Sequence, residues 1–164
     1  MRKSFLILSI PLLILAACSF NPKVVPIGDD YLQGNWEELF SVENDQLVSY
    51  ERYAFKITCD SFYLDIDSYS KVNLEGGECY NDNKWKEYVK GTYHVKDDSL
   101  YLKGAFVNND YRYKPESSCY RFGVYEENFR ITKLGTDSIL INNSLSHLEH
   151  LLVLKERTKC KHVQ

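Results

Sequence analysis

Apolar and polar residues alternate with a period of two over most of the chain after residue 31. In the clearest run, 85–95, one face carries Trp85, Val89, Gly91, Tyr93 and Val95. A period of two is typical of a β-strand, because successive side chains point to opposite faces of a sheet. The same pattern, bounded by polar turn residues, predicts nine strands. They are expected at 33–41, 53–57, 62–66, 85–95, 100–106, 119–125, 128–134, 138–143 and 150–157.

Short polar connections join most of these strands, and connections of a few residues make sequential strands antiparallel neighbours. The predicted fold class is therefore all-β, an antiparallel up-and-down β-barrel of about eight to ten strands, with a two-sheet β-sandwich as the alternative. Closure into a barrel is favoured because it removes exposed sheet edges. Nine alternating strands would make the last strand parallel to the first, so an antiparallel closure needs one strand more or fewer.

The start of the chain has a different pattern. Two basic residues precede an apolar run at 5–15, and small residues at 16–17 precede Cys18. This layout is that of a signal peptide. The run is shorter than the roughly 20 apolar residues that a membrane-spanning helix needs, so it does not predict a transmembrane anchor.

The sequence Leu15-Ala16-Ala17-Cys18 resembles the bacterial lipobox. The resemblance implies diacylglycerol on the sulfur of Cys18, cleavage before it and acylation of the new amine. Two or more acyl chains hold a protein firmly on a membrane, so membrane lipid is the expected partner. The expected organisation is a signal peptide at 1–17, a flexible tether at 18–30 and a barrel domain at 31–164.

Length and charge narrow the function classes. Removing residues 1–17 from the 164 leaves 147, which is enough for one domain with a real core. The signal holds two of the 20 basic residues and none of the 23 acidic ones, so the mature charge falls from −3 to −5. A negative balance disfavours nucleic acid as a partner.

The motif Gly34-Asn35-Trp36, at the start of the first expected strand, resembles the G-x-W signature of lipocalins. The recurring pattern of Gly91-Thr92-Tyr93 before residues 98–102 adds to this motif. Together they make the mature region similar to lipocalin-like lipoproteins of Bacteroidetes. The resemblance implies that Arg157, from the last strand, packs across Trp36 and closes the barrel floor by cation-π stacking. The alternative is that Trp36 is simply a core tryptophan.

Four cysteines remain in the mature chain besides Cys18, and export places them in an oxidising compartment. Two disulfides are expected, with free thiols or a zinc site as the alternatives. The up-and-down strand order places Cys79 and Cys119 at one rim. If the strand miscount lies after Cys119, Cys160 reaches the rim of Cys59. The predicted pairs are Cys79 with Cys119 and Cys59 with Cys160.

Catalytic motifs are not evident. Three pairs of titratable residues stand out, namely Asp65 and Asp67, Glu126 and Glu127, and His147 and His150. Paired carboxylates can serve acid-base chemistry and two histidines can share a metal. A solvent-facing strand, a hairpin turn and a solvated loop explain the three pairs better. The sequence therefore predicts no catalytic residue, metal or cofactor, with an uncharacterised hydrolase or lyase as the remote alternative.

The leading function is binding of a small hydrophobic or amphipathic ligand inside the barrel. The candidate pocket residues are Phe55, Phe62, Tyr93, Phe106 and Phe122, although aromatic stripes in strands also simply fill cores. The rival is a structural or interaction lipoprotein with a filled barrel, whose exposed tyrosines contact an envelope protein or glycan. Those tyrosines are Tyr88, Tyr101 and Tyr113.

The residues after Cys18 bear on location. Ser19 stands where an aspartate retains lipoproteins at the inner membrane of enterobacteria, which implies the outer membrane by analogy. Residues 19–23 also lack the acidic cluster that resembles a surface-export signal in Bacteroidetes. The expected location is the cell envelope, at the outer membrane and facing the periplasm.

Overall fold

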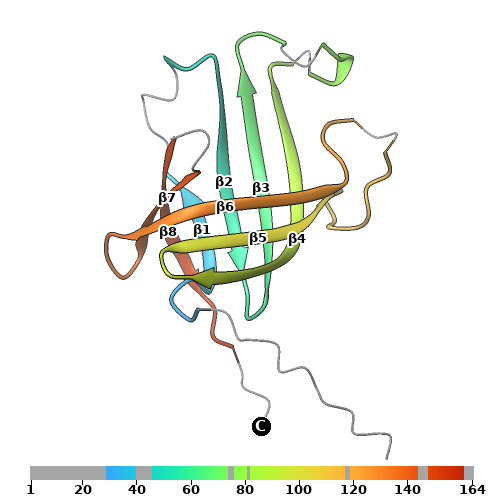
Figure 1. Cartoon of the computed structure of the whole chain (residues 1–164). Helices are drawn as coiled ribbons and strands as arrows, with labels where there is room; N and C mark the ends of the chain where they lie inside the picture. The colour runs from blue at the N-terminus through green and yellow to red at the C-terminus, as the bar shows by residue number, and fades with distance from the viewer. Residues whose placement is uncertain are drawn as a thin grey trace, which may run out of the picture.

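The computed structural model describes residues 29–39, 46–73, 76–80, 82–116, 119–143 and 148–160. Within these residues the chain forms eight strands and a short 3-10 helix, η3 (Glu78–Tyr80) (Figure 1). The strands are β1 (Gly34–Glu38), β2 (Ser49–Ile57), β3 (Ser61–Ser70), β4 (Lys84–Lys96), β5 (Ser99–Val107), β6 (Val124–Lys133), β7 (Ser138–Asn143) and β8 (Glu149–Arg157).

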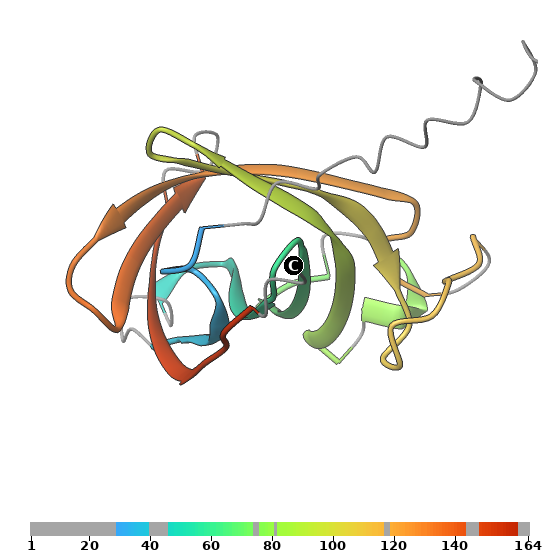
Figure 2. The same cartoon turned by 90° about the horizontal axis from the view of Figure 1, so that it is seen from below.

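Each strand pairs with the next in the chain, and β1 also pairs with β8, so the sheet closes into an antiparallel up-and-down barrel. In Figure 1, β5 and β6 cross in front of β2, β3 and β4, and the view from below in Figure 2 shows the ribbon enclosing a flattened interior. The predicted fold class, a lipocalin-like β-barrel, is confirmed. The two-sheet sandwich is excluded because β1 and β8 join the sheet edges.

The prediction of nine strands was wrong by one, because two of the predicted strands are one. Residues 119–125 and 128–134 were expected to be two strands with Glu126 and Glu127 in the turn between them. Instead, one continuous strand, β6, runs through both glutamates, and the chain from Cys119 to Gly123 precedes it. The alternating burial of β6 shows why, since Tyr125, Phe129 and Ile131 all point inward on one unbroken period of two.

The bend in β4 and β5 depends on two glycines that face each other across the ladder. Gly91 pairs with Gly104, and a Cβ atom on Gly91 would lie 2.1 Å from the backbone oxygen of Lys103. A Cβ on Gly104 would lie 2.3 Å from the oxygen of Lys90. Only residues without a side chain allow this close approach, which lets the paired strands curve round the barrel in Figure 1.

Apolar side chains fill the end of the barrel that includes Trp36, which we call the closed end. Trp36 is 1% exposed and its indole N–H donates to the carbonyl of Leu32 at 2.6 Å. The guanidinium of Arg157 lies 5.7 Å from the centre of the Trp36 ring and donates to the carbonyls of Tyr31 and Thr136. One side chain thus joins the segment before β1, the turn before β7 and the last strand.

Both predicted disulfides are present, Cys59–Cys160 and Cys79–Cys119. Cys59 lies in the turn between β2 and β3, so its bond fastens the segment after β8 to the closed end. Cys79 lies in η3, and its bond to Cys119 joins the β3–β4 connection to the β5–β6 connection. The pairing of Cys59 with Cys160 was predicted on the condition that the miscounted strand lies after Cys119, and the miscount does lie there, in β6.

Candidate ligand-binding cavity

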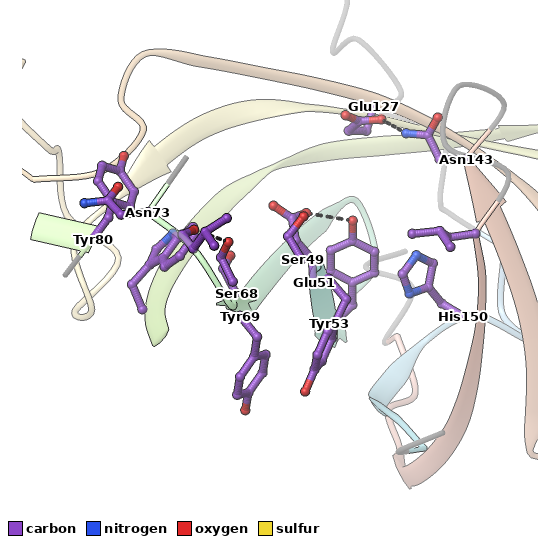
Figure 3. A pocket seen from close by; sticks show the side chains of 15 residues that line it. Ser49, Glu51, Tyr53, Ser68, Tyr69, Asn73, Tyr80, Glu127, Asn143 and His150 are labelled. Atoms are coloured by element: carbon purple, nitrogen blue, oxygen red, sulfur yellow. Dashed lines mark hydrogen bonds between the residues drawn. The ribbon is translucent and has the colours of Figure 1, made fainter. Parts of the chain in front are cut away.

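The end of the barrel opposite Trp36 contains a cavity of about 320 Å³, which we call the polar cavity (Figure 3). It lies among the first residues of β2, β4 and β8 and the last residues of β3 and β7. Its principal inward-facing residues are Glu51, Tyr53, Ser68, Trp85, Glu127, Asn143 and His150. The barrel is therefore filled at one end and hollow at the other.

A buried pair forms the floor between the apolar core and the polar cavity. Glu38 and His150 are 7% and 5% exposed, and Glu38 Oε1 lies 3.0 Å from His150 Nδ1. The other carboxylate oxygen of Glu38 accepts the backbone N–H of Tyr53 at 2.8 Å. The Tyr53 ring lies 4.5 Å from the His150 ring and packs against Phe129 below it. Because each polar group has a partner, this floor can be dry without a large desolvation cost.

Glu51 and Glu87 share one cation, Arg121, which comes from the connection before β6. Arg121 Nη2 donates to Glu51 Oε1 at 2.7 Å, and its Nε donates to Glu87 Oε2 at 2.7 Å. The backbone N–H of Arg121 adds a third bond, to Glu87 Oε1 at 2.8 Å. Glu51 also accepts the hydroxyl of Tyr53 at 3.0 Å. These bonds hold the connection against the barrel and orient Glu51 in the polar cavity.

Glu127 lies on the wall formed by β6, across the polar cavity from Glu51 in Figure 3, and accepts a hydrogen bond from Asn143 Nδ2. Burial, and after it the negative charge of Glu51, raise the pKa of Glu127. Burial and the charge of Glu51 likewise raise the pKa of Tyr53. The negative charge of Glu51 therefore contributes to the raised pKa of groups on both sides of the polar cavity, second to burial.

Aromatic side chains form another wall. The rings of Tyr80 and Trp85 meet edge to face at 4.9 Å, and Tyr120 packs on both of them. The indole N–H of Trp85 donates to Glu87 at 3.2 Å. The disulfide Cys79–Cys119 is adjacent in sequence to Tyr80 and Tyr120, so it fixes the two connections that carry this wall.

None of the five predicted pocket residues lines the polar cavity. Four of them are buried in the apolar core, with exposed fractions of 8% or less, namely Phe55, Phe62, Tyr93 and Phe106. The fifth, Phe122, lies outside the strands before β6 and is 48% exposed. These residues therefore do not form the polar cavity, because the apolar alternation marks the part of the barrel that packs against itself.

The three pairs of titratable residues singled out in the sequence lie in different environments. Asp65 and Asp67 face outward, as expected, and both bind Lys86 at 3.4 Å. Glu126 and Glu127 were expected in a turn but lie on opposite faces of β6. Glu126 points outward to Lys103 at 2.8 Å, whereas Glu127 points inward.

His150 was expected in a solvated loop and is instead the buried partner of Glu38. Its predicted neighbour His147 lies outside the described residues, as do Cys18, the signal peptide and most of the tether. Within the described residues, no group of three His, Cys, Asp or Glu side chains is placed to hold a metal ion. In the same part of the chain, no helix is long and apolar enough to cross a membrane.

The three tyrosines of the rival prediction are not equally available. Tyr88 is half-buried, and its ring meets that of Tyr111 at 5.9 Å. Tyr101 is half-buried and stacks on His94 at 4.7 Å. Only Tyr113 is largely exposed, at 80%. The three tyrosines therefore differ in exposure, and Tyr88 is part of a ring cluster in which Tyr111 also meets Tyr63 at 5.0 Å.

The fold and the site together define a lipocalin-like up-and-down β-barrel with a polar, acidic cavity at one end. Comparisons with family models, with curated proteins and with solved structures find no match for this chain. Its function must therefore be argued from the cavity itself.

Proposed function

We propose that this protein is a lipid-anchored protein of the bacterial cell envelope that binds a small amphipathic molecule in the polar cavity. The observation that supports this most is the cavity of about 320 Å³ next to the packed apolar core of the barrel. Its volume is near the lower end of the ~300–1,000 Å³ range of ligand pockets, so the ligand is small. Its mixed lining, in which two carboxylates and a pair of aromatic rings face the same space, suits a molecule with a polar and an apolar part.

The position of the polar cavity suits a protein tethered by Cys18. The segment after Asp29 lies at the closed end, where Thr158 N donates to Gln33 O at 3.3 Å. The polar cavity lies at the other end of β2. Asp29 is 11 residues after Cys18, so the two can be at most about 40 Å apart when the segment is fully extended. An acyl group on Cys18 would therefore hold the closed end near the membrane and leave the polar cavity facing the periplasm.

Extraction of the purified full-length protein into organic solvent, followed by mass spectrometry, tests the proposal. We expect one small molecule in a stoichiometric amount from the native protein. Ser68→Leu fills the polar cavity and should abolish its recovery. Thr132→Leu, on the exposed outer face of β6, is the matched control and should not. An empty native protein, or equal recovery from Ser68→Leu, would argue against binding in the polar cavity.

A further inference from the structure

The charges at the polar cavity do not balance. Glu51 and Glu127 line the polar cavity in Figure 3, and Glu87 is a third carboxylate at this end, buried on the inward face of β4. No lysine or arginine is among the described residues that line the polar cavity. Arg121 binds Glu87 and Glu51 from the side, and Lys114 lies close enough to Glu87 for its charge to be felt. Even with both cations counted, the carboxylates outnumber them.

Glu127 is the carboxylate without a bonded cation in the described structure. Its hydrogen bonds come from the Asn143 amide and from the backbone of Asn128, and both donors are neutral. Burial and the repulsion of Glu51 raise its pKa, and the attraction of Arg121 offsets this only in part. A positively charged group in the polar cavity would relieve this repulsion between Glu51 and Glu127.

A second observation, independent of charge, also indicates a ligand. Ser68 is 2% exposed and lines the polar cavity, yet its hydroxyl has no hydrogen-bond partner within the described residues. A buried hydroxyl without a partner is costly, because it has lost its water without replacement. The Ser68 oxygen can accept a hydrogen bond from a group that enters the polar cavity.

Apolar surface also lines the polar cavity. Trp85 and Tyr80 present aromatic rings on one side of it, and Leu148 and Val72 add aliphatic carbon elsewhere in its lining. Aromatic faces attract cations as well as apolar groups. The wall and the carboxylates together match a molecule in which a positive charge is joined to a small apolar or aromatic group.

We propose that the ligand is a small amine that is protonated at neutral pH. Its ammonium group lies between Glu51 and Glu127 and donates a hydrogen bond to the Ser68 hydroxyl, while its apolar body packs against Trp85 and Tyr80. This inference rests on the proposed function, because it names the ligand class of the same polar cavity. It differs from a general preference for hydrophobic molecules, since it requires the positive charge.

Three probes of equal size and different charge test this inference by isothermal titration calorimetry on the full-length protein in detergent. 2-Phenylethylamine is the cation, 2-phenylethanol is neutral and phenylacetate is the anion. We expect the amine to bind at least about tenfold more tightly than the alcohol, which is the effect of one charge-assisted hydrogen bond. Phenylacetate should not bind detectably. Equal affinity for the amine and the alcohol would overturn the inference.

Two neighbouring glutamates provide the matched variants. Glu127→Gln removes the inward charge and should lower the affinity for 2-phenylethylamine about tenfold, with little change for 2-phenylethanol. Glu126→Gln makes the same chemical change one residue away on the outer face, where Glu126 binds Lys103, and should change neither affinity. Ser68→Ala should weaken amine binding severalfold. Equal losses from Glu126→Gln and Glu127→Gln would show that only overall charge matters, and would overturn the site.

The outcomes separate this inference from the proposed function. If the extracted molecule lacks a basic nitrogen, and 2-phenylethanol binds as well as the amine, the ligand class is wrong but the binding function stands. If nothing is extracted and none of the three probes releases heat, both proposals are wrong.

Discussion

Replacement of Arg121 by methionine should be among the most damaging single changes at the polar cavity. The side chain of Glu87 is only 1% exposed, and its carboxylate depends on Arg121 for two hydrogen bonds, at 2.8 and 2.7 Å. Methionine preserves most of the length and apolar contact of arginine but removes the charge and the Nε–H donor. Among the described residues, the backbone N–H of residue 121 and the indole of Trp85 would remain as donors to Glu87.

The magnitude follows from the burial of Glu87. Removing one partner of a buried ion pair costs about 3–5 kcal/mol, because it leaves a buried charge uncompensated. The Arg121 side chain is itself 42% exposed, so water can replace part of what is lost. We therefore expect the low end of this range, about 3 kcal/mol of the free energy of unfolding. The attraction between Arg121 and Glu51, which is 33% exposed, should add less than 1 kcal/mol.

The assay is urea unfolding, monitored by circular dichroism under conditions that leave both disulfides intact. Four proteins are compared: native, Arg121→Met, Glu87→Gln and the double variant. If the damage comes from the orphaned carboxylate, Glu87→Gln in the Arg121→Met background should restore about half of the lost stability or more. A loss below 1 kcal/mol for Arg121→Met, or purely additive effects in the double variant, would refute this reasoning.

Four further predictions concern other parts of the molecule. Glu127→Gln should raise the melting temperature at neutral pH, because a carboxyl whose pKa is raised in the folded state destabilises the fold above that pKa. The gain should vanish as the pH falls below the ordinary pKa of glutamate, which melting curves at a series of pH values would show. Loss of Cys59–Cys160 by Cys59→Ser should lower the free energy of unfolding by about 4 to 5 kcal/mol, given a loop of 101 residues, as urea titration can measure. Gly91→Ala should cost about 1–3 kcal/mol in the same titration, because the new Cβ meets a backbone oxygen that cannot move freely. Cys18→Ala should remove palmitate labelling and move the protein from the membrane to the soluble fraction of a cell lysate.

The sequence predicted the barrel because its closed half obeys a simple rule. Phe62, Leu64 and Ile66 alternate with polar residues, and each is 0% exposed in the barrel interior. The turn chemistry at 58–61 and 97–98 then sets antiparallel neighbours, and the same order predicted both disulfides. What failed was the division of β6, since the adjacent glutamates at 126 and 127 looked like a turn when only one of them faces solvent.

The polar cavity could not be found by the same rule, because there the interior itself is polar. β2 begins at Ser49 and β3 extends to Ser70, well beyond the predicted limits of 53 and 66. In these extensions the inward positions hold Glu51 and Ser68, so no contrast between apolar and polar positions remains to mark a strand. The signal in the sequence that could have indicated this end was a charged residue at an inward position of the period-two pattern. Glu87 lies between Trp85 and Val89 on the inward face of β4, where a charged residue is expensive unless a partner or a function requires it.

The free-energy cost of burying a charged residue explains why stability and binding should oppose each other at this site. Arg121 relieves the burial of Glu87 and so supports the fold, but it also takes up part of the negative charge of Glu51. Glu127 has only partial relief, because Arg121 attracts it without bonding to it and its hydrogen-bond donors are neutral, and burial together with Glu51 keeps its pKa raised. A residue that weakens the fold persists most readily where it does something else. Among the described residues no cation is bonded to Glu127, and under the proposed ligand class a small cation in the polar cavity would supply the complementary charge.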